Sequence, residues 1–126
     1  MRIIEPDGLI DTQRMHYSQA IVEDDGSLYT SGQVGWDEHF EVAGEDITTQ
    51  ARQVYENVEI LLEDAGRELE DVRKVTSYLV DAPENLEAYL AVWEDVFDTE
   101  PFPCHTILGV ESLALEEFLL EVEVEL

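Results

Sequence analysis

The chain has 126 residues, 31 of them acidic and only six basic, which gives a formal net charge of −25 at pH 7. A chain this acidic with little apolar content would be disordered, but Leu, Ile, Val and Phe make up roughly 30 % of it, above the roughly 20 % typical of disorder. The composition therefore predicts one folded domain over residues 1–126 with its acids on the surface. It also excludes the basic patch that nucleic acids and anionic membranes require.

The excess of acid predicts a protein adapted to high salt. At low salt such a surface repels itself, whereas at about 1 M salt the Debye length falls to roughly 3 Å and the repulsion is screened. We therefore expect a halophilic and archaeal cytoplasm, with an acidic mesophilic protein as the alternative. The N-terminus has no signal-peptide pattern, no apolar run approaches the ~20 residues of a spanning helix, and the lone Cys104 fits a reducing compartment.

Two strands joined by a hairpin turn are predicted in the first third of the chain. Residues 15–23 form the first strand, residues 24–27 the turn and residues 28–34 the returning strand. A further short strand can precede them at the N-terminus. Gly32 and Gly35, in and beside the second strand, predict a bulge or a close backbone approach.

An amphipathic helix is predicted next, with Asp46 as its N-cap and Gly66 just beyond its C-terminus. Residues 72–80 then form a strand. The helix carries one apolar stripe with helical spacing, which consists of Ile47, Ala51, Val54, Val58, Leu61, Leu62 and Ala65.

A second helix is predicted from about Pro83, because proline suits the first helical turn. Its apolar face consists of Leu86, Tyr89, Leu90, Trp93, Val96 and Phe97. A strand over 104–110 follows, and residues 118–126 alternate in the manner of a half-buried strand. The order β-β-α-β-α-β-β predicts an α+β fold with two helices on one face of a mixed sheet. The other face is left uncovered and partly apolar, which predicts burial in an oligomer.

Six short motifs follow one another along the chain. They are 30–33 (TSGQ), 50–53 (QARQ), 56–58 (ENV), 71–76 (DVRKVT), 102–103 (FP) and 120–123 (LEVE). In order and spacing they resemble the RidA/YjgF family over about residues 15–125. The resemblance implies a chorismate-mutase-like fold and a homotrimer with ligand clefts between subunits. It also implies hydrolysis of small reactive imines and enamines, such as 2-aminoacrylate, to 2-keto acids and ammonia, without a metal or organic cofactor.

The resemblance also implies where a substrate carboxylate would bind. In the deaminase branch an arginine follows Phe-Pro-x and holds that carboxylate through two hydrogen bonds. His105 stands there in this chain, and histidine cannot reproduce the guanidinium fork. His105 could contact a smaller anion or act as a general acid or base, or it could be a hydrogen-bonded histidine in an inactive cleft. A family asparagine on the second helix is replaced near Leu90.

Further site residues follow from the same resemblance. Glu121 matches a glutamate thought to position or activate the attacking water, with an ordinary solvated glutamate as the alternative. Tyr17, Ser31 and Gly32 match residues that line the cleft, with plain sheet geometry as the alternative. Ile107 stands where the backbone carbonyl of a cysteine helps to hold the water.

Three functions are compatible with these residues: an imine or enamine deaminase, a non-catalytic ligand-binding or stress-related trimer, and a ribonuclease or translation inhibitor. The charge of −25 argues against phosphate binding, and therefore against the third. Cys104 and His105 are neighbours on a strand, so they point to opposite faces and cannot pair as nucleophile and base. His16 and His39 have no partner at metal-ligand spacing, so no zinc site is predicted.

Overall fold

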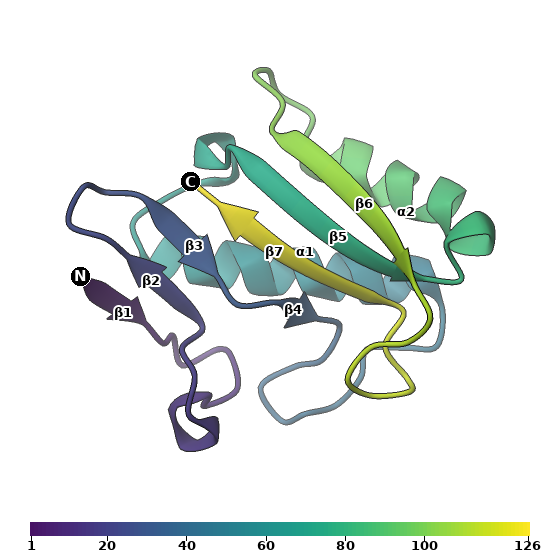
Figure 1. Cartoon of the computed structure of the whole chain (residues 1–126), viewed down its shortest axis with the longest axis horizontal. Helices are drawn as coiled ribbons and strands as arrows, with labels where there is room; N and C mark the ends of the chain where they lie inside the picture. Colours follow the sequence, from purple (N-terminus) through teal and green to yellow (C-terminus); the bar gives the residue numbers. More distant parts are fainter.

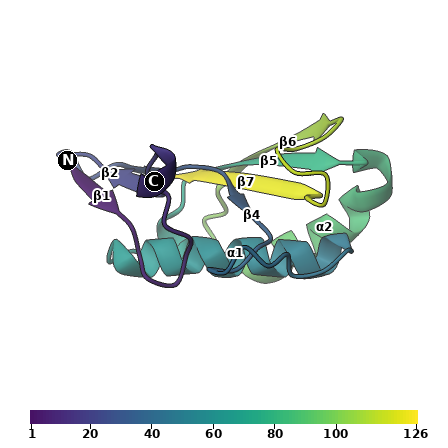
Figure 2. The ribbon, with the colours of Figure 1, turned by 90° about the horizontal axis from the view of Figure 1, so that it is seen from below.

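A computed structural model describes all 126 residues as a seven-stranded mixed sheet with two helices on one face (Figures 1 and 2). The strand order is β1-β2-β3-β7-β5-β6, and β4 pairs with β7 beside β3. Only β5 and β6 run parallel. The predicted α+β architecture and the short N-terminal strand are confirmed. The elements are β1 (Arg2–Ile4), η1 (Gln13–Met15), β2 (Ala20–Val22), β3 (Leu28–Thr30), β4 (Gln33–Val34), α1 (Ile47–Asp64), η2 (Leu69–Asp71), β5 (Lys74–Val80), α2 (Ala82–Val96), β6 (Cys104–Val110) and β7 (Leu120–Glu125).

The hydrophobic core lies between the sheet and the helix layer, which Figure 2 shows edge-on. All seven residues of the predicted α1 stripe are buried. The Asp46 carboxylate caps α1 by accepting the N–H of Thr49 at 2.9 Å, and Gly66 follows the helix with a φ of +71°. Because φ is positive there, glycine is the residue that ends this helix without strain.

The second helix begins at Ala82, one residue before the predicted Pro83, with proline in its first turn. Its buried face differs in part from the predicted one. Val92 and Tyr89 are buried, whereas Leu86 is 38 % exposed. The apolar spacing of α2 is compatible with more than one face, and the packing against β5 and β6 selects the one that carries Val92.

The prediction of a strand over 15–23 is wrong for its first half. Residues 13–15 form a 3₁₀ turn, His16 has a φ of +64°, and regular pairing begins only at Ala20. The Glu5 carboxylate organises this loop, because it accepts the Thr12 hydroxyl at 2.6 Å and the Gln19 N–H at 2.7 Å. These bonds fix an irregular path that alternation alone does not reveal.

The strand predicted over 28–34 is divided into β3 and β4. Both segments pair with β7, but Ser31 and Gly32 lie outside the ladder. The Ser31 N–H donates instead to the carbonyl of Gln19 at 2.8 Å. The predicted close approaches are confirmed, because a Cβ at Gly32 would lie 2.6 Å from Glu121 and one at Gly35 would lie 3.0 Å from Gln50.

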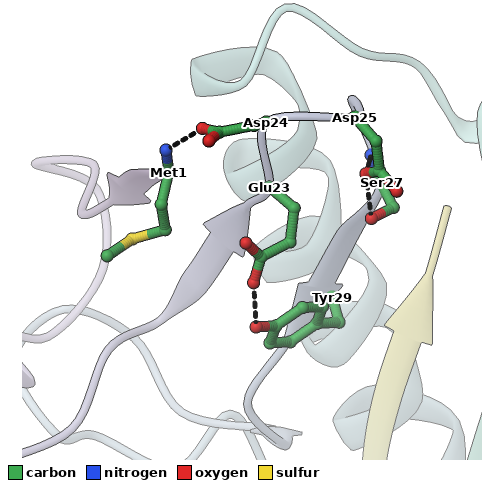
Figure 3. Close-up of polar contacts among 6 residues, drawn as sticks. All are labelled: Met1, Glu23, Asp24, Asp25, Ser27 and Tyr29. Atoms are coloured by element: carbon green, nitrogen blue, oxygen red, sulfur yellow. Dashed lines mark hydrogen bonds and ion pairs between the residues drawn. The ribbon is translucent and has the colours of Figure 1, made fainter.

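The predicted hairpin turn between β2 and β3 is confirmed (Figure 3). Gly26 has a φ of +89°, and the Asp25 carboxylate accepts both the N–H of Ser27 at 2.9 Å and its hydroxyl at 2.6 Å. Beside the turn, the Tyr29 hydroxyl donates to Glu23 at 2.5 Å, and the N-terminal ammonium contacts Asp24. These contacts fasten β1 and the hairpin together at one end of the sheet.

The sheet face opposite the helices carries exposed apolar side chains. Ile3, Tyr29 and Leu108 are each more than 40 % exposed. Ile3 pairs with Ile21, and Ile21 pairs with Tyr29, so the side chains of Ile3, Ile21 and Tyr29 lie on the same face of the sheet. The burial of this face in an oligomer stays a prediction. Neither helix is long and apolar enough to cross a membrane.

Candidate functional site

A cavity of about 230 Å³ opens where β4 and β7 meet three loops. A water molecule takes roughly 30 Å³ in the liquid, so this volume accommodates a small organic molecule. Its apolar wall consists of Ile10, Val34, Trp36, Ala114, Leu115 and Phe118. Its polar part consists of Tyr17, Gln19, Gln33 and Glu121, with the backbone of Gly32 between them.

Glu121 reaches the cavity because β7 alternates its side chains between two faces. Leu120 and Val122 point to the core and are fully buried, so Glu121 points away from the helices. It pairs with Val34 on β4, and its carboxyl is half-buried. Burial raises the pKa of this carboxyl, and the negative charge of Glu123 raises it further. A carboxyl with a raised pKa is a stronger base when ionised, which suits it to accept a proton from water.

Gly32 gives the Glu121 carboxyl its space. A methyl group at position 32 would lie 2.6 Å from both Cδ and Oε1 of Glu121, far inside van der Waals contact. Gly32 has no positive φ, so the requirement for glycine is one of space and not of backbone conformation. At the break between β3 and β4, the Gly32 backbone therefore lies directly against the Glu121 carboxyl that faces the cavity.

Tyr17 stands at the mouth of the cavity and is 41 % exposed. Partial burial raises the pKa of its phenol, and the carboxylates of Glu5 and Glu121 raise it further. The hydroxyl is therefore protonated at neutral pH and can donate a hydrogen bond. It belongs to the loop that Glu5 holds, so a residue remote in sequence fixes its place.

Aromatic rings form one wall of the cavity. Trp36 makes edge-to-face contacts with Phe118 at 5.1 Å and with Phe40 at 5.0 Å between ring centroids. Phe118 precedes β7 and is 2 % exposed, whereas Phe40 is half-exposed and has a φ of +63°. Each such pair contributes roughly 0.5–1.5 kcal/mol beyond the area it buries.

Two amide side chains of α1 hold the loops that carry this wall. The Gln50 amide donates to the carbonyls of Gly44 and Glu117 at 2.9 and 2.8 Å and accepts the N–H of Leu119. Asn57 donates to the carbonyls of Val34 and Trp36 at 3.0 and 2.9 Å. Both amides belong to the short motifs that suggested the family resemblance, and their role is to pin the cavity walls to the helix.

His105 does not line this cavity. It pairs with Val75 on the helix side of the sheet, where its Nε2 meets the Ser77 hydroxyl at 2.8 Å and its ring stacks on Trp93 at 3.7 Å. The hydrogen-bond chain continues from Ser77 to Tyr89 at 2.6 Å and from Tyr89 to Tyr55 at 2.5 Å. Burial lowers the pKa of His105 to about 4. These contacts favour the hydrogen-bonded alternative over an acid-base or anion-binding role.

The other predicted site residues divide between the cavity and its surroundings. Tyr17, Gly32 and Glu121 come together in the cavity. Ile107 packs against the core on the helix side of β6, and Ser31 lies just outside the cavity with its hydroxyl bonded to the Ser18 carbonyl at 2.6 Å. One chain alone does not bring Ile107 or His105 to Glu121.

Sequence reasoning missed the aromatic wall and the two glutamines. Trp36 follows no period, and Phe118 belongs to the alternating residues 118–126 but lies in the loop before β7, which begins at Leu120. Gln33 ends the TSGQ motif, which was the available signal. Gln19 falls within the predicted strand over 15–23, and a regular strand gives no sign that its amide is buried beside a cavity. No group of three or more His, Cys, Asp or Glu side chains is close enough to hold a metal ion.

The fold and cavity together define a small α+β domain with one carboxylate set into an apolar ligand cavity. Comparison with known proteins agrees with this class and identifies the family. The family model described as Endoribonuclease L-PSP matches residues 11–125. A RutC family protein of Aquifex aeolicus is 37 % identical over 111 residues, which is 87 % of this chain and 85 % of the relative. A RutC family protein of Pyrococcus abyssi is 44 % identical over 108 residues, covering 85 % and 82 %.

Solved structures agree with these sequence relatives. The crystal structure of RidA from an Antarctic Psychrobacter has a TM-score of 0.88 and 31 % identity, and the match covers 100 % of this chain and 98 % of that one. The YjgH protein has a TM-score of 0.87 and 31 % identity, covering 98 % and 93 %. The chain therefore belongs to the Endoribonuclease L-PSP family, which is the RidA/YjgF family that its motifs resemble, and the chorismate-mutase-like fold is confirmed.

Proposed function

We propose that the protein hydrolyses small reactive imines and enamines in the Glu121 cavity. The observation that carries this proposal is a half-buried carboxyl with a raised pKa, exposed to a cavity that is otherwise largely apolar. Such a group can accept a proton from water and later donate it to the leaving amine. Hydrolysis of a C=N bond requires both proton transfers. Family membership and the likeness to a protein named RidA support the same reaction class.

The proposed reaction uses Glu121 as both base and acid. The imine takes a proton from solvent, and the ionised carboxylate accepts a proton from water while the water oxygen bonds to the iminium carbon. The protonated carboxyl then gives that proton to the amino group of the carbinolamine. As the C–N bond breaks, the carbinolamine hydroxyl gives its proton to the carboxylate, which returns it to solvent, and the products are a carbonyl compound and ammonia. Tyr17 donates its hydroxyl hydrogen to the substrate or the water as a positioning contact.

We further propose that the protein is a cytoplasmic homotrimer, as the family resemblance implies. The exposed Ile3, Tyr29 and Leu108 lie on one sheet face and supply apolar area for association. Contacts across that face could bring β6 of one chain towards the cavity of another. Sedimentation in molar KCl tests the assembly, since a trimer mass is expected and a monomer mass at micromolar concentration would contradict it.

The site does not support ribonuclease activity. RNA phosphates are bound by Lys and Arg, and no Lys or Arg lines the cavity. A protein that binds small ligands without turnover is the second candidate, because the family arginine is replaced by His105 and the cavity would hold a ligand equally well.

The test is hydrolysis of imines generated in situ by an amine or amino-acid oxidase in molar KCl. The wild type should accelerate release of ammonia over buffer. Glu121→Gln should lower kcat/KM by about 10²- to 10⁴-fold, the usual contribution of an acid-base group. Glu125→Gln is the matched control, since Glu125 lies on the same strand outside the cavity and is exposed. Equal rates for Glu121→Gln and wild type would refute the role of Glu121.

A further inference from the structure

We propose that the cavity selects imines without a carboxylate, in which an apolar substituent and a nitrogen-bound hydrogen are the features recognised. This inference rests on the proposed function and names its substrate class. It departs from the 2-imino acids that the family resemblance implies, and its basis is the set of donors and acceptors that the cavity offers.

The cavity presents acceptors and a few neutral donors, but no cationic side chain. Glu121 offers a carboxyl whose oxygens are acceptors when ionised. Gln33 uses its amide nitrogen for the Gln19 side chain at 2.9 Å and the Ser31 carbonyl at 3.2 Å, so its carbonyl oxygen is the atom left for a ligand. The amide nitrogen of Gln19 donates a hydrogen bond to the Ile10 carbonyl at 3.1 Å. The donors that remain are neutral: the Tyr17 hydroxyl, and the indole N–H of Trp36 and the backbone N–H of Gly32, which make no hydrogen bond within the chain.

A carboxylate needs what this cavity lacks. A buried carboxylate is held most strongly by a cationic donor, above all by the guanidinium fork. The Ser31 hydroxyl, which could have served, points to the Ser18 carbonyl at 2.6 Å. A substrate carboxylate would therefore meet the Glu121 carboxyl with only neutral donors to receive it. Salt does not remove the repulsion between the substrate carboxylate and the Glu121 carboxylate, because the two groups would be in contact and screening acts over longer distances.

The cations of the chain lie away from the cavity. Four of the six basic side chains are engaged within their own chain: Arg14 with Asp11, Arg52 with Asp95, Arg67 with the carbonyl of Gly26 and Arg73 with the carbonyl of Glu70. Arg2 and Lys74 make no such contact, and they stand on β1 and at the start of β5. Arg2 and Lys74 are therefore the two cations with no hydrogen-bond or ion-pair partner in their own chain.

The nitrogen end and the apolar end of a carboxylate-free imine match the two halves of the cavity. An N–H or iminium group can donate to the Glu121 carboxyl and to the Gln33 carbonyl. Its substituent can pack against Trp36 and Phe118. The reaction stays balanced: imine and water give carbonyl compound and ammonia, with no other reactant.

The test compares two imines that differ only in the carboxylate. Amino-acid oxidase converts phenylalanine to its imino acid, and monoamine oxidase converts phenethylamine to the imine without the acid. Oxygen uptake shows that each oxidase works equally with and without the protein in molar KCl. We expect kcat/KM for the carboxylate-free imine to exceed that for the imino acid by at least about tenfold. A preference for the imino acid would overturn the inference.

A binding arm separates this inference from the proposed function. Calorimetric titration with phenylacetamidine and with phenylacetate, a cationic analogue and an acid of equal size, reports selection without turnover. Tighter binding of the amidine with no hydrolysis of either imine would uphold the inference and refute the deaminase function. Tighter binding of phenylacetate, or no binding of either, would overturn the inference.

Two variants locate the cause if the acid is preferred. Arg2→Gln and Lys74→Gln each remove one of the uncommitted cations. Loss of phenylacetate binding in either variant would show that a second copy completes the cavity with that side chain. Retention of phenylacetate binding in both would show that the donor inventory of the single chain is wrong. Either result overturns the inference as stated.

Discussion

At the scale of single residues, Gly32 and Glu121 form one unit. Gly32, which has no side chain, lies directly against the Glu121 carboxyl at the break between β3 and β4. Alternation along 118–126 was enough to place Glu121 on the face away from the core. The tight contact with Gly32 was foreseen only as a general close approach, because sequence does not name the partner of a glycine.

Gly32→Ala should displace the Glu121 carboxyl and reduce activity more than stability. A displacement of about 1 Å in a catalytic group can cost about 10²-fold in rate, whereas the end of a flexible glutamate yields to a methyl group at little cost in folding. We expect kcat/KM to fall by about that factor, with a small change in melting temperature. Gly8→Ala is the control, since its Cβ would meet Ile60 at an ordinary 3.4 Å. Full activity of Gly32→Ala would contradict this account.

His105 should make folding stability depend on pH. Its folded pKa of about 4 lies below the ordinary value of 6.5 because burial disfavours the charged ring. The stabilisation is therefore complete above pH 6.5 and is lost as pH falls towards 4. The free energy of unfolding of wild type should drop relative to that of His105→Gln over this range in molar KCl. His39→Gln, at an exposed histidine, should track wild type, and parallel curves for all three proteins would contradict the prediction.

At the scale of elements, α1 both builds the core and holds the site. Its apolar stripe and its caps could be predicted from sequence, because periodicity and capping are local signals. The roles of Gln50 and Asn57 could not, because their partners lie in loops up to 69 residues away in the chain. Strand boundaries failed for the same reason at Tyr17 and Ser31, where side-chain contacts from remote residues replace the ladder.

Asn57→Leu should destabilise the fold and loosen the cavity wall. The substitution keeps the number and branching of the side-chain heavy atoms but leaves the carbonyls of Val34 and Trp36 without their donor, which costs about 1–3 kcal/mol for a buried group. Denaturant unfolding in molar KCl measures the loss. Glu56→Leu, at the exposed neighbouring position, is the matched control and should change stability by under about 0.5 kcal/mol. Equal stability of Asn57→Leu and wild type would refute the pinning role.

At the scale of the whole molecule, the acids are mostly without cationic partners. Among lysine and arginine side chains only Arg14 and Arg52 form ion pairs with carboxylates. The core, the sheet and the cavity are therefore wrapped in a surface that repels itself, as the composition predicted. Composition could indicate this because charge is a property of the sum of residues, whereas the cavity depends on a few positions.

The melting temperature should rise between 0.1 M and 3 M KCl, because screening removes the repulsion that opposes compaction. Thermal unfolding followed by circular dichroism across that range checks this. Sucrose at matched viscosity is the control for effects that do not involve charge. A melting temperature that stays flat in KCl would contradict adaptation to a salty cytoplasm.

The central claim is that the Glu121 carboxyl exchanges protons with water and substrate in its cavity. The most direct measurement is the pH dependence of kcat/KM for a carboxylate-free imine in molar KCl, for wild type and for Glu121→Gln. Burial and Glu123 raise the pKa of this carboxyl, so activity of wild type should rise with pH through an apparent pKa above the ordinary range of glutamate. That limb should be absent in the variant. The same limb in both proteins would show that another group carries the chemistry.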